Sequence, residues 1–211
     1  MKSLRVAVLA SGGGSNLKAL IEASQRGDLS AQIVLVISNN RDAGALNIAR
    51  DAGIAVKHIS AAVFPEAADL EQAFMNVFDE FEVNFLVLAG YMKMISTAII
   101  RKFENRILNI HPALLPAFGG KGMYGKHVHQ AVLEYGCKVS GVTVHLVDEK
   151  YDSGAPVLQR CVPVRQDDTP ESLAARVLQE EHKIYAEALQ LFAENRIRIE
   201  GRKVFIEESS H

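Results

Sequence analysis

Cysteine is scarce in this chain of 211 residues, since Cys137 and Cys161 are the only two. Neither lies in a CxxC motif or another spacing typical of metal ligands, and such a chain is typical of a reducing compartment. Long apolar runs are also missing. The apolar stretch from Leu4 ends at glycines too soon for a signal peptide or a membrane-spanning segment. The sequence therefore predicts a cytoplasmic protein with no membrane partner.

An excess of charge is missing as well, because the formal net charge is −2. At this balance no broad basic surface for nucleic acid is expected, so an anionic ligand must be held by a local group of residues. Proline is scarce, and no repeat or low-complexity tract interrupts the chain. The length fits a single domain, 1–211, better than two.

Segments rich in Val, Ile and Leu alternate with segments of helical periodicity. The predicted strands are Leu4–Ala10, Ile33–Ser38, Phe85–Ala89, Arg106–Ile110, Val139–Val147 and Pro156–Val164. The predicted helices are Ser15–Arg26, Ala43–Ala52, Glu66–Glu82, His127–Tyr135 and a long helix capped by Thr169. The tail from Ile197 predicts one further strand. This alternation predicts an α/β fold, a doubly wound, mostly parallel central sheet with helices on both faces.

Three consecutive glycines join the first predicted strand to the first predicted helix. Gly12, Gly13 and Gly14 let the backbone approach an oxyanion closely, and the helix that follows points its free N–H groups at it. Ser15 and Asn16 can cap this helix or bind a phosphate. The loop lacks the third glycine of a dinucleotide motif and the lysine of a P-loop. It favours a mononucleotide or a ribose phosphate; a turn that needs glycine for backbone reasons alone is the alternative.

Asn109 and His111 lie two residues apart at the end of a predicted strand, so their side chains share one side. Pro112 ends the strand at this point. At the carboxyl end of a parallel strand, that side faces the crevice where ligands bind. An amide and an imidazole there can stabilise an oxyanion, and the imidazole can move protons. A purely structural histidine is the alternative.

Asp152 lies in the segment Asp148–Gly154, an acidic loop between two apolar strands. If this loop folds over the crevice, its carboxylate favours the charged form of a neighbouring imidazole and can accept a proton from an attacking amine. A solvated turn is the alternative. His145, inside the preceding strand, is expected to be a hydrogen-bonded core residue.

Five segments together resemble the folate-dependent formyltransferases, and within them the branch that acts in purine biosynthesis. These segments are Ser11–Leu17, Val87–Met92, Leu108–Pro116, Gly141–His145 and Asp152–Gly154. The string Leu-Asn-Ile-His-Pro-Ala-Leu-Leu-Pro is highly specific to the family and its hydrolase relatives. The resemblance covers almost the whole chain. It implies a Rossmann-like formyltransferase fold and transfer of a formyl group from 10-formyltetrahydrofolate to the amine of phosphoribosylglycinamide.

The resemblance also implies roles for individual residues. Asn109 and His111 would stabilise a tetrahedral intermediate, and Asp152 would assist proton transfer. The half 1–105 would bind the ribonucleotide phosphate, and the half 106–211 would carry catalysis and folate binding. The implied ribonucleotide contacts are Gly12, Gly13, Gly14, Ser15, Asn16 and Glu181. The implied folate contacts are Met92, Lys93, Met94, Ile95 and Asp148. No metal is expected.

The chain departs from the family pattern in two places. Many members carry an arginine near the start of the Glu66–Glu82 helix, whereas here no basic residue lies between His58 and Lys93. The segment Ala117–Lys126 is longer than the loop common in the family, and its glycines predict mobility.

Other functions remain open at this point. A formyltetrahydrofolate hydrolase, in which water replaces the amine, is the main alternative, although such relatives usually carry a regulatory domain before the first strand. A methionyl-tRNA formyltransferase usually adds a C-terminal domain and a basic surface. A non-catalytic nucleotide-binding module is the remaining alternative. The expected partners are small-molecule substrates, and the assembly is either a monomer or a homodimer.

Overall fold

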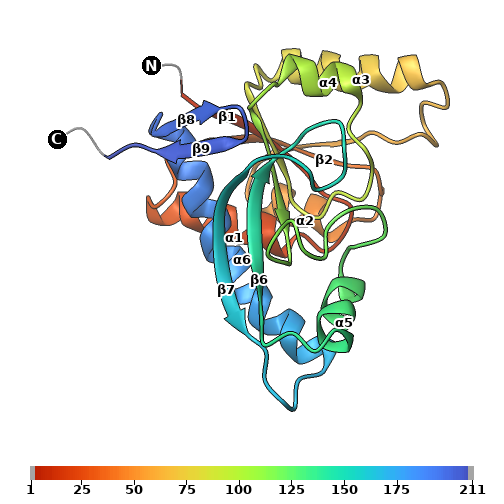
Figure 1. Ribbon diagram of the computed structural model, residues 1–211. Helices are drawn as coiled ribbons and strands as arrows, with labels where there is room; N and C mark the ends of the chain where they lie inside the picture. The colour runs from red at the N-terminus through yellow and green to blue at the C-terminus, as the bar shows by residue number, and fades with distance from the viewer. Residues whose placement is uncertain (1–2, 209–211) are drawn as a thin grey trace. The chain divides into compact units, whose positions relative to one another are not determined.

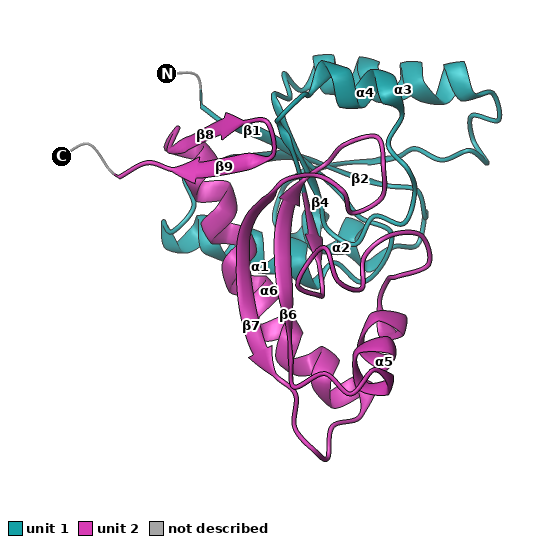
Figure 2. Ribbon diagram, viewed as in Figure 1, with its two compact units in different colours: residues 1–108 teal, residues 109–211 magenta. Residues whose placement is uncertain are grey.

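The computed structural model describes residues 3–208. The chain forms two compact units, Met1–Leu108 and Asn109–His211 (Figure 2). The boundary falls inside strand β5 (Ile107–His111), whereas the expected boundary between the two halves lies between residues 105 and 106. The larger sheet has the strand order β3-β2-β1-β4-β5-β6-β7.

Unit 1 is built on parallel strands. They are β1 (Arg5–Leu9), β2 (Gln32–Ser38), β3 (Ala55–His58) and β4 (Phe85–Leu88). β1 pairs in parallel with β2 on one side and β4 on the other, and β2 pairs in parallel with β3. β1 and β4 are buried almost throughout, as expected for parallel strands that are covered on both faces.

Four helices cover these strands. They are α1 (Ser15–Arg26), α2 (Gly44–Asp51), α3 (Ala67–Glu80) and α4 (Thr97–Lys102). Figure 1 shows α1 and α2 on one face of the unit 1 strands and α3 and α4 on the other. This is the doubly wound arrangement that the alternation of strands and helices predicts.

Unit 2 combines an antiparallel strand pair with a long helix. Its elements after β5 are α5 (Lys126–Glu134), β6 (Val139–Leu146), β7 (Pro156–Pro163), α6 (Pro170–Ala193), β8 (Ile197–Glu200) and β9 (Lys203–Ile206). β6 and β7 pair antiparallel, and α6 packs against both of them and against α5. The side of α6 toward the core is a stripe of buried residues: Leu173, Val177, Ile184, Ala188 and Leu191.

The start of α6 agrees with its sequence signals. Thr169 Oγ1 accepts a hydrogen bond from the Ser172 N–H at 3.2 Å, and Ser172 Oγ accepts one from the Thr169 N–H at 3.0 Å. Pro170 is the first helical residue, where its missing N–H costs no hydrogen bond. These contacts satisfy backbone donors that a helix start leaves free.

The predicted α/β fold with a mostly parallel sheet is confirmed, and three details need correction. The sequence pattern did not predict β3, because four half-buried residues give no periodic signal. It also did not predict α4, which has only six residues. The tail forms a separate two-stranded hairpin, β8–β9, where one strand was expected. Within residues 3–208, no helix combines the length and apolarity needed to cross a bilayer.

Candidate active site

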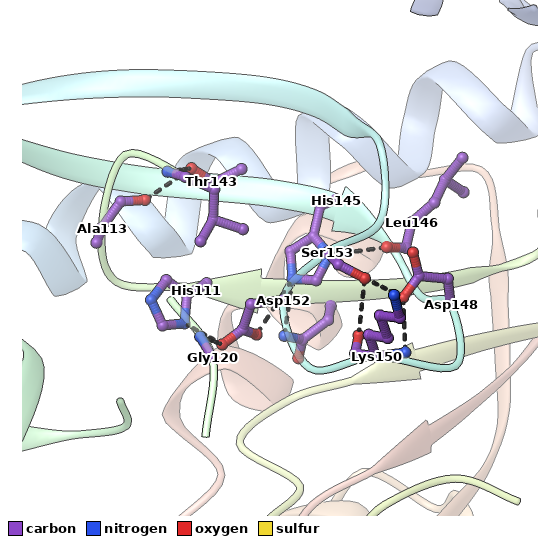
Figure 3. A network of polar contacts seen from close by, with 12 residues as sticks. His111, Ala113, Gly120, Thr143, His145, Leu146, Asp148, Lys150, Asp152 and Ser153 are labelled. Carbon is purple, nitrogen blue, oxygen red and sulfur yellow. Dashed lines mark hydrogen bonds and ion pairs between the residues drawn. The ribbon is translucent and has the colours of Figure 1, made fainter. Parts of the chain in front are cut away.

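Four polar side chains gather around the end of β5 in unit 2 (Figure 3). His111 and His145 are buried, with 3% and 2% of their surface exposed. The Asp152 carboxylate faces both rings, with Oδ2 3.5 Å from His111 Nδ1 and Oδ1 3.7 Å from His145 Nε2. Asn109 Nδ2 lies 3.0 Å from His145 Nε2. The three residues expected at the catalytic centre therefore lie together, and His145 joins them.

His145 is fixed in one tautomer by its backbone partner. Its Nδ1 atom lies 2.7 Å from the Leu146 carbonyl oxygen, which only accepts, so Nδ1 carries the hydrogen. Burial lowers the pKa of His145 and outweighs the opposing effects of the Leu146 carbonyl and Asp152. The ring is therefore neutral, and its Nε2 atom accepts a hydrogen bond. The expectation of a hydrogen-bonded core histidine is confirmed.

This tautomer determines how the Asn109 amide faces. Because Nε2 of neutral His145 is an acceptor, Asn109 must turn its NH₂ group toward it. One hydrogen of Nδ2 is used in that bond. The second hydrogen of the same NH₂ group is directed elsewhere in the plane of the amide, where it can be donated to a ligand oxygen.

His111 has acceptors at both ring nitrogens. Its Nε2 atom lies 2.8 Å from the Phe118 carbonyl oxygen and must donate to it. Its Nδ1 atom faces the Asp152 carboxylate. Only a ring with hydrogens on both nitrogens presents a donor to each of these acceptors. The geometry of unit 2 therefore suits an imidazolium paired with a carboxylate.

Asp152 reaches this position through an unusual backbone. Its φ of 52° lies in the left-handed region, which Asp and Asn tolerate better than most residues. Two residues later, a Cβ on Gly154 would lie 1.7 Å from the Leu146 carbonyl oxygen, so only glycine lets the loop return this close to β6. The Gly120 N–H donates to Asp152 Oδ2 at 2.9 Å. The Asp-Ser-Gly string thus brings the carboxylate to the two histidines.

The rest of this loop is tied together by Asp148. Its Oδ1 atom accepts from the Ser153 hydroxyl at 2.5 Å and from the Lys150 N–H at 2.9 Å (Figure 3). The Arg202 guanidinium, in the β8–β9 turn, donates to the Ser153 carbonyl oxygen at 2.8 Å. Asp148, expected to contact folate, therefore also has a structural part in shaping the loop that carries Asp152.

Thr143 is a supporting residue that the sequence analysis did not single out. Its hydroxyl donates to the Ala113 carbonyl oxygen at 2.7 Å and accepts from the Leu115 N–H at 3.0 Å. These bonds hold the segment that follows His111 against β6. Alternation along a strand places Thr143 and His145 on one face. The spacing of these two residues in the string Gly-Val-Thr-Val-His could therefore have indicated that Thr143 lies on the same face as His145.

His129 is a third buried histidine, close to this cluster. It lies on α5 with 4% of its surface exposed. Burial lowers its pKa, and the charge of His111 lowers it further. The His129 ring is therefore neutral.

The glycine loop lies in unit 1, where its three glycines meet different surroundings. Gly14 has a φ of 82°, and a Cβ there would lie 2.7 Å from Ala45 Cα, so the fold itself requires glycine. A Cβ on Gly12 or on Gly13 would meet no described atom within 4 Å. The fold of unit 1 therefore gives no steric reason for glycine at these two positions, and the space beside their backbone is open.

The other expected ribonucleotide contacts begin helices or lie on them. Ser15 and Asn16 form the first turn of α1, whose N-cap is Gly14 and so supplies no side-chain oxygen. A helix start without such an oxygen presents its N–H groups to whatever anion lies in front of it. Glu181 lies half-buried on α6 in unit 2.

The expected folate contacts Met92, Lys93, Met94 and Ile95 follow β4 in unit 1. Met92 and Met94 are 50% and 58% exposed, whereas Ile95 is buried. Large exposed apolar side chains on an irregular segment suit contact with a flat aromatic ligand. Among the described residues, no group of three or more His, Cys, Asp or Glu side chains is placed to hold a metal ion.

Comparison with known sequences gives a consistent result. Residues 4–189 match the model of the formyl transferase family. The protein named "Phosphoribosylglycinamide formyltransferase, chloroplastic" from Vigna unguiculata is 46% identical over 92% of this chain, which spans 62% of that relative. "Phosphoribosylglycinamide formyltransferase" from Escherichia coli (strain K12) is 34% identical over 97% of this chain, which spans 94% of that relative. The chain spans only 20% of the "Trifunctional purine biosynthetic protein adenosine-3" of Bos taurus, at 42% identity.

Solved structures agree with the sequence comparison. "Glycinamide ribonucleotide transformylase 1" from Symbiobacterium toebii superposes with a TM-score of 0.92 at 42% identity, covering 98% of this chain and 95% of the other. A "formyltetrahydrofolate deformylase" from Pseudomonas syringae superposes with a TM-score of 0.88 at 23% identity, covering 98% of this chain and 67% of the other. At that identity the second likeness concerns the fold alone.

Proposed function

This chain belongs to the formyl transferase family, and we propose that it transfers a formyl group from 10-formyltetrahydrofolate to the amine of phosphoribosylglycinamide in de novo purine biosynthesis. The names and coverage of the bacterial relatives support this choice of acceptor. The observation that carries the proposal is the gathering of Asn109, His111 and Asp152 in unit 2, with donors and acceptors assigned by their partners.

The side chains supply the charges that formyl transfer needs. When the amine nitrogen attacks the formyl carbon, negative charge develops on the formyl oxygen. The free hydrogen on Asn109 Nδ2 and the charged His111 ring stabilise that oxygen. Asp152 accepts the proton that the attacking nitrogen loses and gives it up to the folate nitrogen as the bond from that nitrogen to the formyl carbon breaks. The products are a formamide and tetrahydrofolate, so atoms and charge balance.

We assign the two ligand-binding roles to separate segments. The backbone beside Gly12 and Gly13, with the α1 start at Ser15 and Asn16, would hold the ribonucleotide phosphate. This assignment is supported by the open space at the first two glycines and by the uncapped helix start. Glu181 would contact the glycinamide end of the ribonucleotide. The exposed methionines of the Met92–Ile95 segment and the Asp148 loop would frame the folate.

The remaining expectations belong to the same proposal. Both substrates are small molecules, and the reaction needs no metal and no nucleic acid. A cytoplasmic location is proposed for this chain, although the plant relatives are named chloroplastic. The active assembly is proposed to be a monomer or a homodimer.

Hydrolysis of the formyl donor is the second candidate, because the deformylase of Pseudomonas syringae shares the fold. The two reactions differ only in whether an amine or water attacks. Following folate absorbance with and without phosphoribosylglycinamide separates them. We expect release of tetrahydrofolate to require the ribonucleotide and to yield one formylated ribonucleotide per folate. Release at the same rate without the ribonucleotide would reject formyl transfer in favour of hydrolysis.

A further inference from the structure

Ser11 connects the ends of three neighbouring strands in unit 1. It follows Ala10, the residue after the end of β1, and precedes the glycine loop. Its N–H donates to the Gly90 carbonyl oxygen, beyond β4, at 3.1 Å. Its hydroxyl oxygen lies 2.5 Å from Asn39 Oδ1, beyond β2, and accepts from the Met92 N–H at 2.8 Å.

The direction of each bond at the Ser11 hydroxyl follows from its partners. The Met92 backbone N–H can only donate, so it uses a lone pair of Oγ. Asn39 Oδ1 can only accept, so it takes the hydroxyl hydrogen. The hydroxyl is therefore held at both its donor and its acceptor side, and it cannot rotate away without losing a bond.

The Met92–Ile95 segment has little regular structure of its own to hold it. It follows Gly90, whose φ is 71°, and it belongs to neither a helix nor a strand. Met92 and Met94 are exposed, whereas Ile95 is buried. A segment that must present exposed apolar side chains in a fixed position needs backbone hydrogen bonds at its start. The Ser11 hydroxyl provides one at Met92.

We propose that Ser11 is a positioning residue that holds the Met92–Ile95 segment against the glycine loop and thereby sets the affinity for the formyl donor. Ser11 touches neither substrate in this role. The inference rests on the proposed function only in identifying the ligand of this segment as the formyl folate. The bond between Ser11 and Met92 itself is independent of that identification.

Kinetics of four variants test the role. Ser11→Ala removes the acceptor for the Met92 N–H, so we expect the KM for 10-formyltetrahydrofolate to rise about fivefold to tenfold, with kcat changed by less than about twofold. Ser11→Thr keeps a hydroxyl and should restore the KM. Asn39→Ala leaves the Ser11 hydroxyl free to rotate, so it should raise the KM for 10-formyltetrahydrofolate by a smaller factor than Ser11→Ala does. Ser24→Ala, at an exposed position on α1, is the matched control and should leave the KM unchanged.

A donor KM for Ser11→Ala equal to that of the unaltered protein overturns the proposal, as does a fall in kcat at constant KM. Hydrogen exchange of the Met92 amide, measured by NMR on the full chain without substrates, gives a second readout. We expect exchange to be about fivefold or more faster in Ser11→Ala but not in Ser11→Thr. Unchanged exchange overturns the positioning role whatever the substrates are. Faster exchange in a protein that shows no amine-dependent formyl transfer supports the contact and rejects the proposed function.

Discussion

Nε2 of the buried His145 lies 3.0 Å from Nδ2 of Asn109, and this contact determines which end of the Asn109 amide faces the ring. The ring is held in its tautomer by the Leu146 carbonyl and kept neutral by burial. An amide that was free to turn would offer an oxygen in place of a donor to the developing oxyanion, which would then be repelled. In the proposed mechanism, His145 would therefore act on the reaction through Asn109.

Replacement of His145 tests this indirect role. We expect His145→Ala to lower kcat about tenfold to a hundredfold, because loss of one oriented oxyanion donor has effects of this size. The donor KM should change much less. Circular dichroism melts should show whether the variant is folded at the assay temperature. A folded variant with normal kcat would mean that Asn109 is oriented without His145.

Replacement of His111 or of Asp152 should have a larger effect. We expect His111→Ala and Asp152→Asn each to lower kcat by about 10² to 10⁴, the range for loss of a general acid or base. Asn tolerates the left-handed backbone that Asp152 adopts at φ 52°, so Asp152→Asn should remain folded. Steady-state assays of both variants measure the effect. Near-normal turnover in either one would remove that residue from the mechanism.

The glycine loop allows a matched pair of substitutions. Gly14→Ala places a Cβ 2.7 Å from Ala45 Cα at a φ of 82°, so we expect it to lower the free energy of unfolding by about 1 to 3 kcal/mol. Gly13→Ala meets open space, so it should leave the free energy of unfolding nearly unchanged and raise the KM for the ribonucleotide. Urea unfolding and steady-state kinetics measure the two effects. If Gly13→Ala is as destabilising as Gly14→Ala, the glycines serve the backbone alone.

Stability should fall on mild acidification. Burial lowers the pKa of His145 and of His129 in the folded chain, whereas both ionise near pH 6.5 when unfolded. Below about pH 6.5 the unfolded chain therefore binds protons that the folded chain does not. The free energy of unfolding falls as the pH falls toward the pKa values that the two histidines have in the folded chain. Carboxylates whose pKa is lowered in the folded chain, such as Glu180, also stabilise it, and this stabilisation is lost only below about pH 4.5.

Urea unfolding at pH 7.5 and at pH 5.5 measures whether stability falls with pH in this direction. The unaltered chain should be less stable at pH 5.5. In His129→Leu the difference in the free energy of unfolding between the two pH values should be smaller, because one of the two histidines whose pKa is lowered by burial is gone. A chain that is equally stable or more stable at pH 5.5 would contradict the assignment of neutral rings.

Much of the fold could be predicted from local patterns. Apolar strands and periodic helices are properties of neighbouring residues, and so is the α6 start at Thr169 and Pro170. The elements that were missed lack such a pattern. β3 is short and half-buried, and the antiparallel pairing of β6 with β7 depends on which segments meet, which local periodicity does not encode.

The sequence by itself determined the family, the candidate residues Asn109, His111 and Asp152, and the position of the glycine loop, because each rests on neighbouring residues or on a specific string. Only the tertiary structure decided how these residues work together. The neutral tautomer of His145 depends on burial, and the required glycine at position 14 depends on Ala45, far from it in the sequence. Burial and close approach exist only once distant segments have packed, so no reading of local sequence can supply them.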